Sequence, residues 1–439
     1  MKNLLGTSLV ILIYPALYEI LEFLTGDIAL VSISILVLTL GYLLLRMNTM
    51  SKLLNKKIVL LWVTVIGLIP IFLNFIQEII LQNGRLYDYV YNSINTLFNL
   101  SILFLGAVFI LTNNERFIKR ILISILIIIL LSFLANIYFP NVFIGMAILQ
   151  GRVQFENVDS LSRLFGLYIQ SNNAALAVLS LIPLLLFTPK IKSIAYYFLL
   201  SILLVALVFS TGSRSGIFLA TLFFILYSLS LAFRSLRYYH RLSLDSSFAT
   251  FAVGLGIFAY LVVLVISFAV QNLKTNEQYS DSIRRLEILT SSKKGEGIES
   301  DGSFLARLEA QKVYLEKIIN NPFGYGNIGK ERLFNSGELH HVSHNMYIEN
   351  TFKYGIVYLF ILFYTIAYSF VKVRKTFLRN SMLSTLFVII LLFGVTMSGV
   401  LSRRAMLLSL GMVLGYYLKE RILLSRRKSV EANFNPISA

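Results

Sequence analysis

The amino-acid sequence predicts an all-α integral membrane protein with about 12 transmembrane helices and one large helical loop on the outer, periplasmic side. Apolar residues make up 57% of the 439 residues, charged residues make up only 14%, and the mean hydropathy is +0.75. Soluble domains contain fewer apolar and more charged residues. Stretches of roughly 17 to 25 mostly apolar residues, the length that crosses a bilayer as a helix, recur along the chain.

The predicted spans fall into two groups on either side of a polar segment. Nine lie in residues 1–270 and three lie in residues 346–439, ahead of a cytoplasmic tail, so residues 271–345 form an outer subdomain. The spans are expected at about residues 4–24, 28–45, 58–80, 93–111, 121–139, 167–188, 193–210, 215–233, 247–270, 346–371, 381–400 and 404–418. The first stretch contains two glutamates and lacks a small-residue cleavage site, so we expect it to be retained as a span.

The basic residues indicate the orientation. The chain carries 39 Lys and Arg against 22 Asp and Glu, a formal net charge of +17. With the N-terminus inside, the loops assigned to the cytoplasm hold 22 of the 39 basic residues but only 4 of the 22 acidic ones, as the positive-inside rule requires. Both termini are therefore expected in the cytoplasm. The outer subdomain holds ten basic and ten acidic residues, so it is not a polybasic tail and nucleic acid is not an expected partner.

The first five predicted spans are rich in Leu, Ile and Val, and we interpret them as scaffold. The outer loop 140–165 and the sixth span are different. The loop contains Arg163, and the span opens with the polar run Gln170–Ala175, which includes Asn173. Polar residues in hydrocarbon are costly unless they face protein or a wet cavity. This run is therefore a candidate for the wall of a site.

The turn at residues 210–216 is so short that Arg214 must lie at the outer membrane face, at the start of the eighth span and next to Ser213. The N–H groups and positive dipole end of a helix N-terminus, together with a guanidinium fork, favour phosphate. The alternative is an arginine that snorkels to the interface beside a helix-capping serine.

The outer subdomain is expected to contain a helix that begins at Ser303 as its N-cap and ends before Asn321-Pro322. An apolar stripe at helical spacing supports this helix and consists of Phe304, Leu308, Leu315 and Ile319. Arg307 lies beside the stripe, where it points either toward a site or into solvent.

Three of the four histidines, His340, His341 and His344, directly precede the tenth span. Imidazole titrates near neutral pH, so this cluster suits a general base. A zinc site built from the three histidines is the alternative, although only Glu338 lies nearby to complete it, and the chain contains no cysteine.

Polar residues continue into the tenth span. Asn345 stands before it, and Glu349 and Lys353 are four residues apart, so we expect the two charges to pair on one helix face. A charge inside the membrane is a functional candidate by default. A buried structural pair is the alternative.

The order of these pieces resembles the O-antigen polymerase and O-antigen ligase superfamily of polytopic membrane glycosyltransferases, over roughly residues 150–360. The motifs that carry the resemblance are Arg163-Leu164-Phe165-Gly166, Asn172-Asn173-Ala174, Gly212-Ser213-Arg214-Ser215-Gly216, Arg307 in a helix that ends Asn321-Pro322-Phe323-Gly324-Tyr325-Gly326, and His344-Asn345 followed by Gly355. Their order and their common side of the membrane support the assignment more than any one of them does.

The resemblance implies an enzyme that moves a glycan from an undecaprenyl diphosphate carrier to an acceptor sugar hydroxyl at the outer face of the cytoplasmic (inner) membrane. The reaction would be inverting, metal-independent and of the C type, without a cofactor. The implied partners are the lipid-linked glycan donor, the glycan acceptor, membrane lipid and a chain-length regulator protein.

The residues present suit that chemistry. The chain has no Asp-x-Asp motif to hold a metal, so arginines would have to hold the leaving diphosphate. The expected diphosphate ligands are Arg214 and Arg307, then Arg163, and then Arg403 and Arg404 at an outer span end. His344 is the expected base and Glu349 its supporting carboxylate. Further site residues are expected at Asn345, His341, Ser213 and Asn173.

The preferred function is a surface polysaccharide polymerase, for O-antigen or capsule, because repeat-unit polymerases are the more numerous and diverse class. An O-antigen ligase that transfers glycan to lipid A core is the first alternative. A flippase for lipid-linked sugars is the second, although a transporter would place its charges near the membrane midplane.

Overall fold

The computed structural model describes residues 2–76, 86–149, 166–168, 170–187, 194–211, 213, 215–223, 302–339, 342–377 and 382–434. Every regular element within these residues is a helix, which confirms the predicted all-α class for them. The predicted domain boundaries stay predictions, because the start of the outer subdomain lies outside the described ranges.

The helix boundaries follow the apolar stretches of the sequence in part. A helix, Met47–Leu54, occupies the predicted loop between spans 28–45 and 58–80, another, Pro140–Leu149, opens the predicted loop 140–165, and the last helix ends at Phe434 instead of about residue 418. The principal helices are α1 Lys2–Ile13, α2 Tyr18–Thr25, α3 Ile28–Leu44, α4 Met47–Leu54, α5 Lys57–Val63, α6 Ile69–Phe75, α7 Leu86–Thr112, α8 Glu115–Tyr138, α9 Pro140–Leu149, α10 Ser171–Leu186, α11 Ile194–Ser210, α15 Gly302–Asn320, α16 Gly326–Asn335, α17 Met346–Thr376, α18 Thr385–Thr396 and α19 Arg404–Phe434. A π-helical turn, Thr64–Leu68, joins α5 to α6. Residues 215–223 are also helical.

Four helices in the described residues are long and apolar enough to cross a membrane: Lys57–Phe75, Tyr89–Thr112, Glu115–Tyr138 and Met346–Thr376. Two bent pairs, α1 with α2 and α3 with α4, raise the number to six if each pair is one span. Helices α10 and α18 are apolar but shorter. The total of twelve stays a prediction, since the expected span at 247–270 lies outside the described residues.

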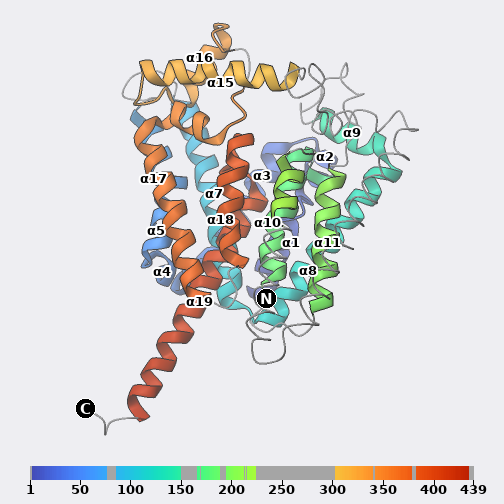
Figure 1. The fold of residues 1–439 in the computed structure, drawn as a ribbon, viewed down its shortest axis with the longest axis vertical. Coiled ribbons are helices and arrows are strands. Elements are labelled where there is room, and N and C mark those ends of the chain that lie inside the picture. The colour runs from blue at the N-terminus through green and yellow to red at the C-terminus, as the bar shows by residue number, and fades with distance from the viewer. Residues whose placement is uncertain are drawn as a thin grey trace, which may run out of the picture.

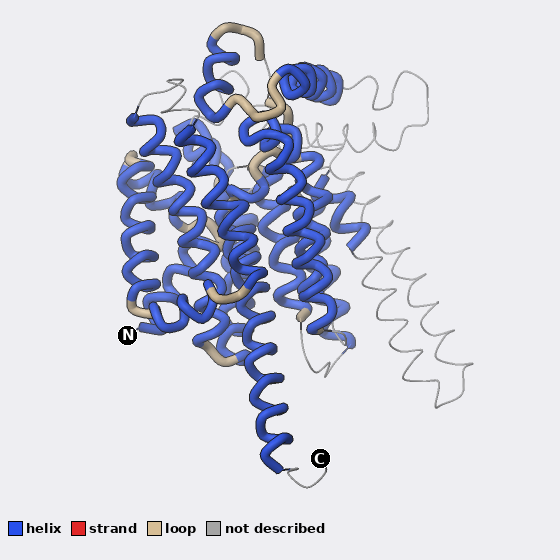
Figure 2. The backbone as a smooth tube through the Cα atoms, turned by 90° about the vertical axis from the view of Figure 1, so that its left-hand side faces the viewer, coloured by secondary structure: helices blue, strands red, loops and turns tan. Residues whose placement is uncertain are grey.

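The long helices run side by side in a bundle, and α15 and α16 lie together on one end of it (Figure 1). Helix α15 crosses that end at a steep angle to the bundle, while both chain termini lie toward the opposite end (Figures 1 and 2). This arrangement agrees with an outer subdomain opposite two cytoplasmic termini. Which membrane face each end meets stays a prediction from the charge distribution.

Helices α7 and α19 pack backbone against backbone. A Cβ at Gly411 would lie 2.0 Å from the carbonyl oxygen of Leu103, and one at Gly415 would lie 2.7 Å from that of Ala107. Small residues four apart allow this close approach. In a membrane, helices associate through such close packing, because lipid provides no hydrophobic driving force between them. This contact joins the C-terminal helix to the N-terminal half of the bundle.

The first predicted span, 4–24, is broken rather than continuous. Helices α1 and α2 are bent by 75° across Tyr14–Leu17. Pro15 lies in the break and has no N–H to continue a helix, and Ala16 adopts a left-handed φ of 61°. The hydroxyl of Tyr168 donates a hydrogen bond of 2.9 Å to the freed carbonyl of Tyr14. Such replacement partners let a span break inside a bundle.

Helix α17 is broken at Gly355, whose φ of 82° and ψ of 170° lie outside the helical range. The turn that follows α15 docks onto this break. Tyr325 N donates to the Phe352 carbonyl at 2.8 Å, and Ile356 N donates to the Pro322 carbonyl at 2.9 Å. The turn and Gly355, two motifs of the predicted family, are therefore one structural unit.

Helix α15 packs on this unit through Ala310, Tyr314 and Ile318, which are buried. The rings of Tyr314 and Phe352 lie 4.8 Å apart. The helix begins at Gly302, so Ser303 lies in its first turn and is not its N-cap.

The helix predicted from the apolar stripe is present, but the structure leaves most of that stripe exposed. Leu308, Leu315 and Ile319 are 40%, 46% and 78% exposed, and the side chain of Phe304 lies outside the described residues. The helix carries apolar residues on two faces, and periodicity alone does not distinguish which face packs. The face with Ala310, Tyr314 and Ile318 is the one that packs on the bundle.

We expect Gly324→Ala to loosen the outer subdomain. Gly324 has a φ of +93°, and an added Cβ would lie 2.5 Å from the Lys353 carbonyl oxygen. A non-glycine residue in this conformation costs at least about 1 kcal/mol before the clash is counted. The variant should melt at a lower temperature in detergent and be cut faster by protease between α15 and α17.

The matched control is Gly41→Ala, because a Cβ at Gly41 meets no atom within 4 Å. Equal melting temperatures and cleavage rates for the two variants would show that the turn does not depend on Gly324.

Candidate functional site

The structure describes eight of the eleven predicted site residues: Asn173, Ser213, Arg307, His344, Asn345, Glu349, Arg403 and Arg404. Arg163, Arg214 and His341 lie outside the described residues, as does His340. Of the first two proposed diphosphate ligands, Arg214 and Arg307, the structure therefore describes only Arg307.

A polar cavity of about 570 Å³ lies between the break of α1 and α2, helices α7, α10 and α17, and the start of α19. Three predicted site residues line it, Asn173, Arg403 and Arg404. The sequence analysis did not assign a role in the site to the other charged and amide residues of the lining, which are Glu19, Glu22, Asn92, Asn95, Asn99, Asn327 and Lys353. Because Asn327 belongs to α16 and Lys353 to the first half of α17, the cavity lies toward the end of the bundle that carries α15 and α16 (Figure 1).

Arg404 is held by several elements of the cavity wall. Its Nη2 donates to Ser32 Oγ at 3.0 Å, and its Nη1 lies 3.9 Å from Oε1 of Glu22. Its guanidinium carbon lies 4.1 Å from the ring centre of Tyr18 and 4.8 Å from that of Phe98. A cation between two aromatic faces and beside a carboxylate is well stabilised. Arg404 thus fixes the start of α19 against α2, α3 and α7.

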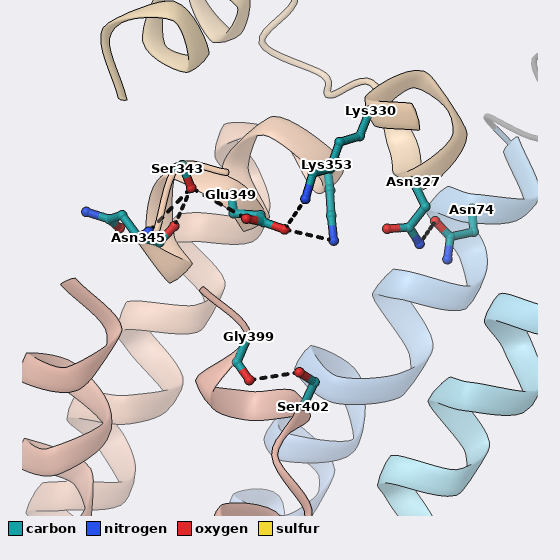
Figure 3. A network of polar contacts seen from close by, with 9 residues as sticks. All are labelled: Asn74, Asn327, Lys330, Ser343, Asn345, Glu349, Lys353, Gly399 and Ser402. Atoms are coloured by element: carbon teal, nitrogen blue, oxygen red, sulfur yellow. Dashed lines mark hydrogen bonds and ion pairs between the residues drawn. The ribbon is translucent and has the colours of Figure 1, made fainter. Parts of the chain in front are cut away.

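Glu349 is the centre of a charge cluster that includes Lys353 of the cavity wall (Figure 3). It is 7% exposed, and its Oε1 lies 2.6 Å from Lys330 Nζ and 3.2 Å from Lys353 Nζ. The predicted pairing of Glu349 with Lys353 is present, and Lys330 of α16 joins it. Burial lowers the pKa of the Lys330 ammonium, Lys353 lowers it further, and Glu349 opposes both effects. Two cations against one carboxylate leave the cluster with a net positive charge.

His344 lies in the turn that leads into α17. It adopts a left-handed φ of 51°, which is uncommon for a residue other than glycine. Asn345 is the N-cap of α17, and its Oδ1 accepts from the N–H groups of Tyr347 and Ile348. A non-glycine residue held in this conformation often marks a functional position.

Ser343 connects the His344 turn to the charge cluster. Its Oγ accepts from Asn345 N at 3.3 Å, and its one hydroxyl hydrogen has two acceptors in reach, the Asn345 carbonyl at 3.2 Å and Oε2 of Glu349 at 3.5 Å (Figure 3). Gln311 of α15 donates to the Ser343 carbonyl at 3.2 Å. Glu349 therefore contacts both the histidine turn, through Ser343, and the cavity, through Lys353.

Arg307 is one helical turn before Gln311, so it shares the α15 face that meets the His344 turn. The structure thereby brings the predicted arginine of the outer helix toward the predicted base. The sequence alone placed the two residues 37 positions apart without indicating this approach.

Ser213 caps the helix that follows it, as the sequence suggested. Its Oγ accepts from Gly216 N at 3.2 Å and donates to Asn172 Oδ1 at 2.7 Å. The polar run of the sixth span and the turn around residue 213 are therefore in contact. The neighbouring Asn173 faces the cavity instead.

Within the described residues, no group of three or more His, Cys, Asp and Glu side chains could hold a metal ion. Because His340 and His341 are outside these residues, the zinc alternative is untested.

Residues 199–364 match a protein-family model described as O-antigen ligase. The matched segment contains Arg307, His344, Glu349 and the docked turn at 321–325, whereas Asn173, Arg403 and Arg404 lie outside it. A comparison with curated proteins gives no match. The family match confirms the resemblance to the O-antigen polymerase and ligase superfamily. Together with the apolar helices, it indicates a multi-pass membrane protein with a glycosyltransferase-like activity.

We expect Glu349→Gln to destabilise the outer end of the bundle by about 1–3 kcal/mol, because it leaves Lys330 and Lys353 without their shared carboxylate. The His344 turn should also become more accessible, since Ser343 loses a charged acceptor. Thermal melting and hydrogen exchange of residues 342–350 would measure the two effects.

Glu309→Gln makes the same chemical change at an exposed position of α15, away from the cluster, and is the control. If both variants melt and exchange alike, Glu349 does not organise the turn.

Proposed function

We propose that this protein is a metal-independent, inverting glycosyltransferase that joins undecaprenyl-diphosphate-linked oligosaccharide repeat units at the outer face of the cytoplasmic membrane. The observation that carries the proposal is the polar cavity with Arg403, Arg404 and Lys353 in its wall, joined through Glu349 to the His344 turn. This arrangement places cations that can bind a diphosphate and a histidine, His344, that can act as a general base at one end of an apolar bundle.

The chemistry assigns each group a role. An acceptor sugar hydroxyl attacks the anomeric carbon of the donor, a new C–O bond forms, and the bond from that carbon to the diphosphate oxygen breaks. His344 takes the hydroxyl proton as a neutral imidazole. The diphosphate leaves with its negative charge, which fixed cations stabilise as it develops.

Several cations are available to the diphosphate. Arg403, Arg404 and Lys353 line the cavity, Arg307 shares a helix face with the contact to the His344 turn, and Arg214 and Arg163 are proposed from the motif resemblance. Guanidinium groups bind phosphate oxygens in two-point geometry without a metal ion. The proposed reaction therefore needs no cofactor.

A transferase also accounts for the position of the charges better than a flippase does. Transporters bind substrate near the bilayer midplane between repeated halves. Here the cavity includes Asn327 and Lys353 from the outer end, close to the cap formed by α15 and α16. The lipid-linked donor, the acceptor glycan and a chain-length regulator are the proposed partners.

The second candidate is an O-antigen ligase that transfers glycan to lipid A core. The description of the matched family model favours it directly. Both enzymes use the same donor chemistry, and they differ in the acceptor that enters the site. We prefer the polymerase because repeat-unit polymerases are the more numerous and diverse class within this superfamily.

The test uses purified protein with a lipid-diphosphate-linked repeat unit, with and without chelator, and resolves products by glycan length. Wild type should build a ladder in both conditions. His344→Asn should slow it by about 10²–10⁴-fold, the usual contribution of a general base. Asparagine tolerates the left-handed backbone at this position but cannot take up the proton.

Melting temperatures of wild type and His344→Asn should agree, which separates lost chemistry from lost folding. Transfer to added lipid A core without a ladder would identify the ligase. Movement of lipid-linked sugar across vesicles without any transfer would contradict the enzyme proposal, and loss of activity with chelator would contradict metal independence.

A further inference from the structure

The cavity wall contains a row of asparagines that the proposed reaction does not use. Asn92, Asn95 and Asn99 are spaced i, i+3 and i+7 on α7, which places them on one helix face. All three line the cavity, and Asn173 lines it from α10. Amides inside an apolar bundle are costly unless they have partners. A concentration of four amides around one cavity indicates a polar ligand.

Asn173 shows the strongest need for a partner. Its Oδ1 is buried and accepts no hydrogen bond within the part of the chain that the structure describes. Its neighbour Asn172 differs, because its Oδ1 accepts from Ser213. Because Oδ1 is closed to solvent, a ligand in the cavity would contact Asn173 through the part of the side chain that is exposed.

The charges of the wall favour a neutral ligand over a second anion. Three cations and the carboxylates of Glu19 and Glu22 line the cavity, so its net formal charge is small. The proposed diphosphate would occupy the cations of the wall, which leaves the amides for a neutral group. Amides both donate and accept, which matches hydroxyl groups that also do both.

The size and the rings of the cavity fit a sugar. A volume of about 570 Å³ is in the usual range of roughly 300–1,000 Å³ for small-ligand pockets. Tyr168 and Tyr354 add aromatic rings to the wall, and such rings offer an apolar surface with a polar edge. The apolar tail of a lipid carrier would find mostly polar side chains here.

We propose that this cavity is a saccharide subsite, in which Asn92, Asn95, Asn99 and Asn173 bind the hydroxyl groups of a neutral pyranose of the repeat unit. The inference rests on the proposed function for the identity of the glycan, and it goes beyond that function by assigning the sugar to α7 and α10. The reacting diphosphate then lies toward the cations of the cavity wall, and the sugar lies toward its asparagines.

The first experiment measures binding without turnover. The probe is the water-soluble oligosaccharide released by mild acid from the lipid-linked donor, and inorganic pyrophosphate is the anion comparison. The oligosaccharide should raise the melting temperature of the wild-type protein in a saturable manner. Asn95→Leu should weaken this binding about tenfold, as expected for one lost hydrogen bond to an uncharged ligand. Asn95 is exposed to the cavity, so the substitution removes little packing.

The matched control is Asn48→Leu, the same chemical change at an exposed position of α4, which lies at the other end of the bundle (Figure 1). Its affinity for the oligosaccharide should equal that of wild type. No stabilisation of wild type by the oligosaccharide, or equal weakening by Asn48→Leu and Asn95→Leu, would overturn the proposal. Stabilisation by pyrophosphate that depends on Asn95 would also overturn it, by showing an anion site.

The outcomes separate this inference from the proposed reaction. Asn95-dependent oligosaccharide binding in a protein that transfers no glycan would support the subsite and refute the transferase. A glycan ladder made by wild type and Asn95→Leu with the same KM would support the transferase and refute the subsite. If both proposals hold, Asn95→Leu should raise KM about tenfold and change kcat little, because it removes binding and not chemistry.

Discussion

The docking of the turn at residues 321–325 onto the break of α17 is the contact on which the end of the molecule with α15 and α16 depends. Breaking a helix at Gly355 frees backbone groups, and the turn supplies partners for them through Tyr325 N and the Pro322 carbonyl. Both glycines, Gly324 and Gly355, bring backbone against backbone where a Cβ would clash. Because free backbone groups are costly when buried, the turn, α15 and the first half of α17 form one unit. The His344 turn and Glu349 belong to the same unit.

A second set of contacts keeps polar groups inside an apolar bundle. The break between α1 and α2 is satisfied by Tyr168, and the Tyr14 hydroxyl lies between Ser180 and Ser409 at 3.0 and 2.7 Å. The same break turns the carboxylates of α2 toward the start of α19, where Arg404 meets Glu22. A continuous first span would leave no cavity at this place. Irregular backbone at membrane depth is tolerated where it lines such a cavity, and here it forms one wall of the candidate site.

The two units meet at Lys353. This residue is in the cavity wall, and its ammonium pairs with Glu349, which in turn accepts from Ser343 beside the proposed base. A carboxylate shared by two lysines keeps positive charge near the cavity and holds the turn before α17 in position. Because preorganised charges act without rearrangement as a reaction proceeds, such a cluster suits a site where a diphosphate leaves without a metal ion. The arrangement joins residues of α16, α17 and α19 that are far apart along the chain.

The sequence by itself determined the all-α class, the position of many helices, the pairing of Glu349 with Lys353 and the resemblance over roughly residues 150–360, because apolar length, i to i+4 spacing and motif order are local properties. Pro15 is a local signal of the break in the first predicted span, which a count of apolar residues does not detect. The tertiary structure decided the rest. It selected the Tyr314 face of α15 over the Leu308 face, it brought Lys330 to Glu349, and it made one cavity from asparagines in a span interpreted as scaffold. These are contacts between distant segments, and hydrophobic periodicity carries no information about which face of a helix meets which neighbour.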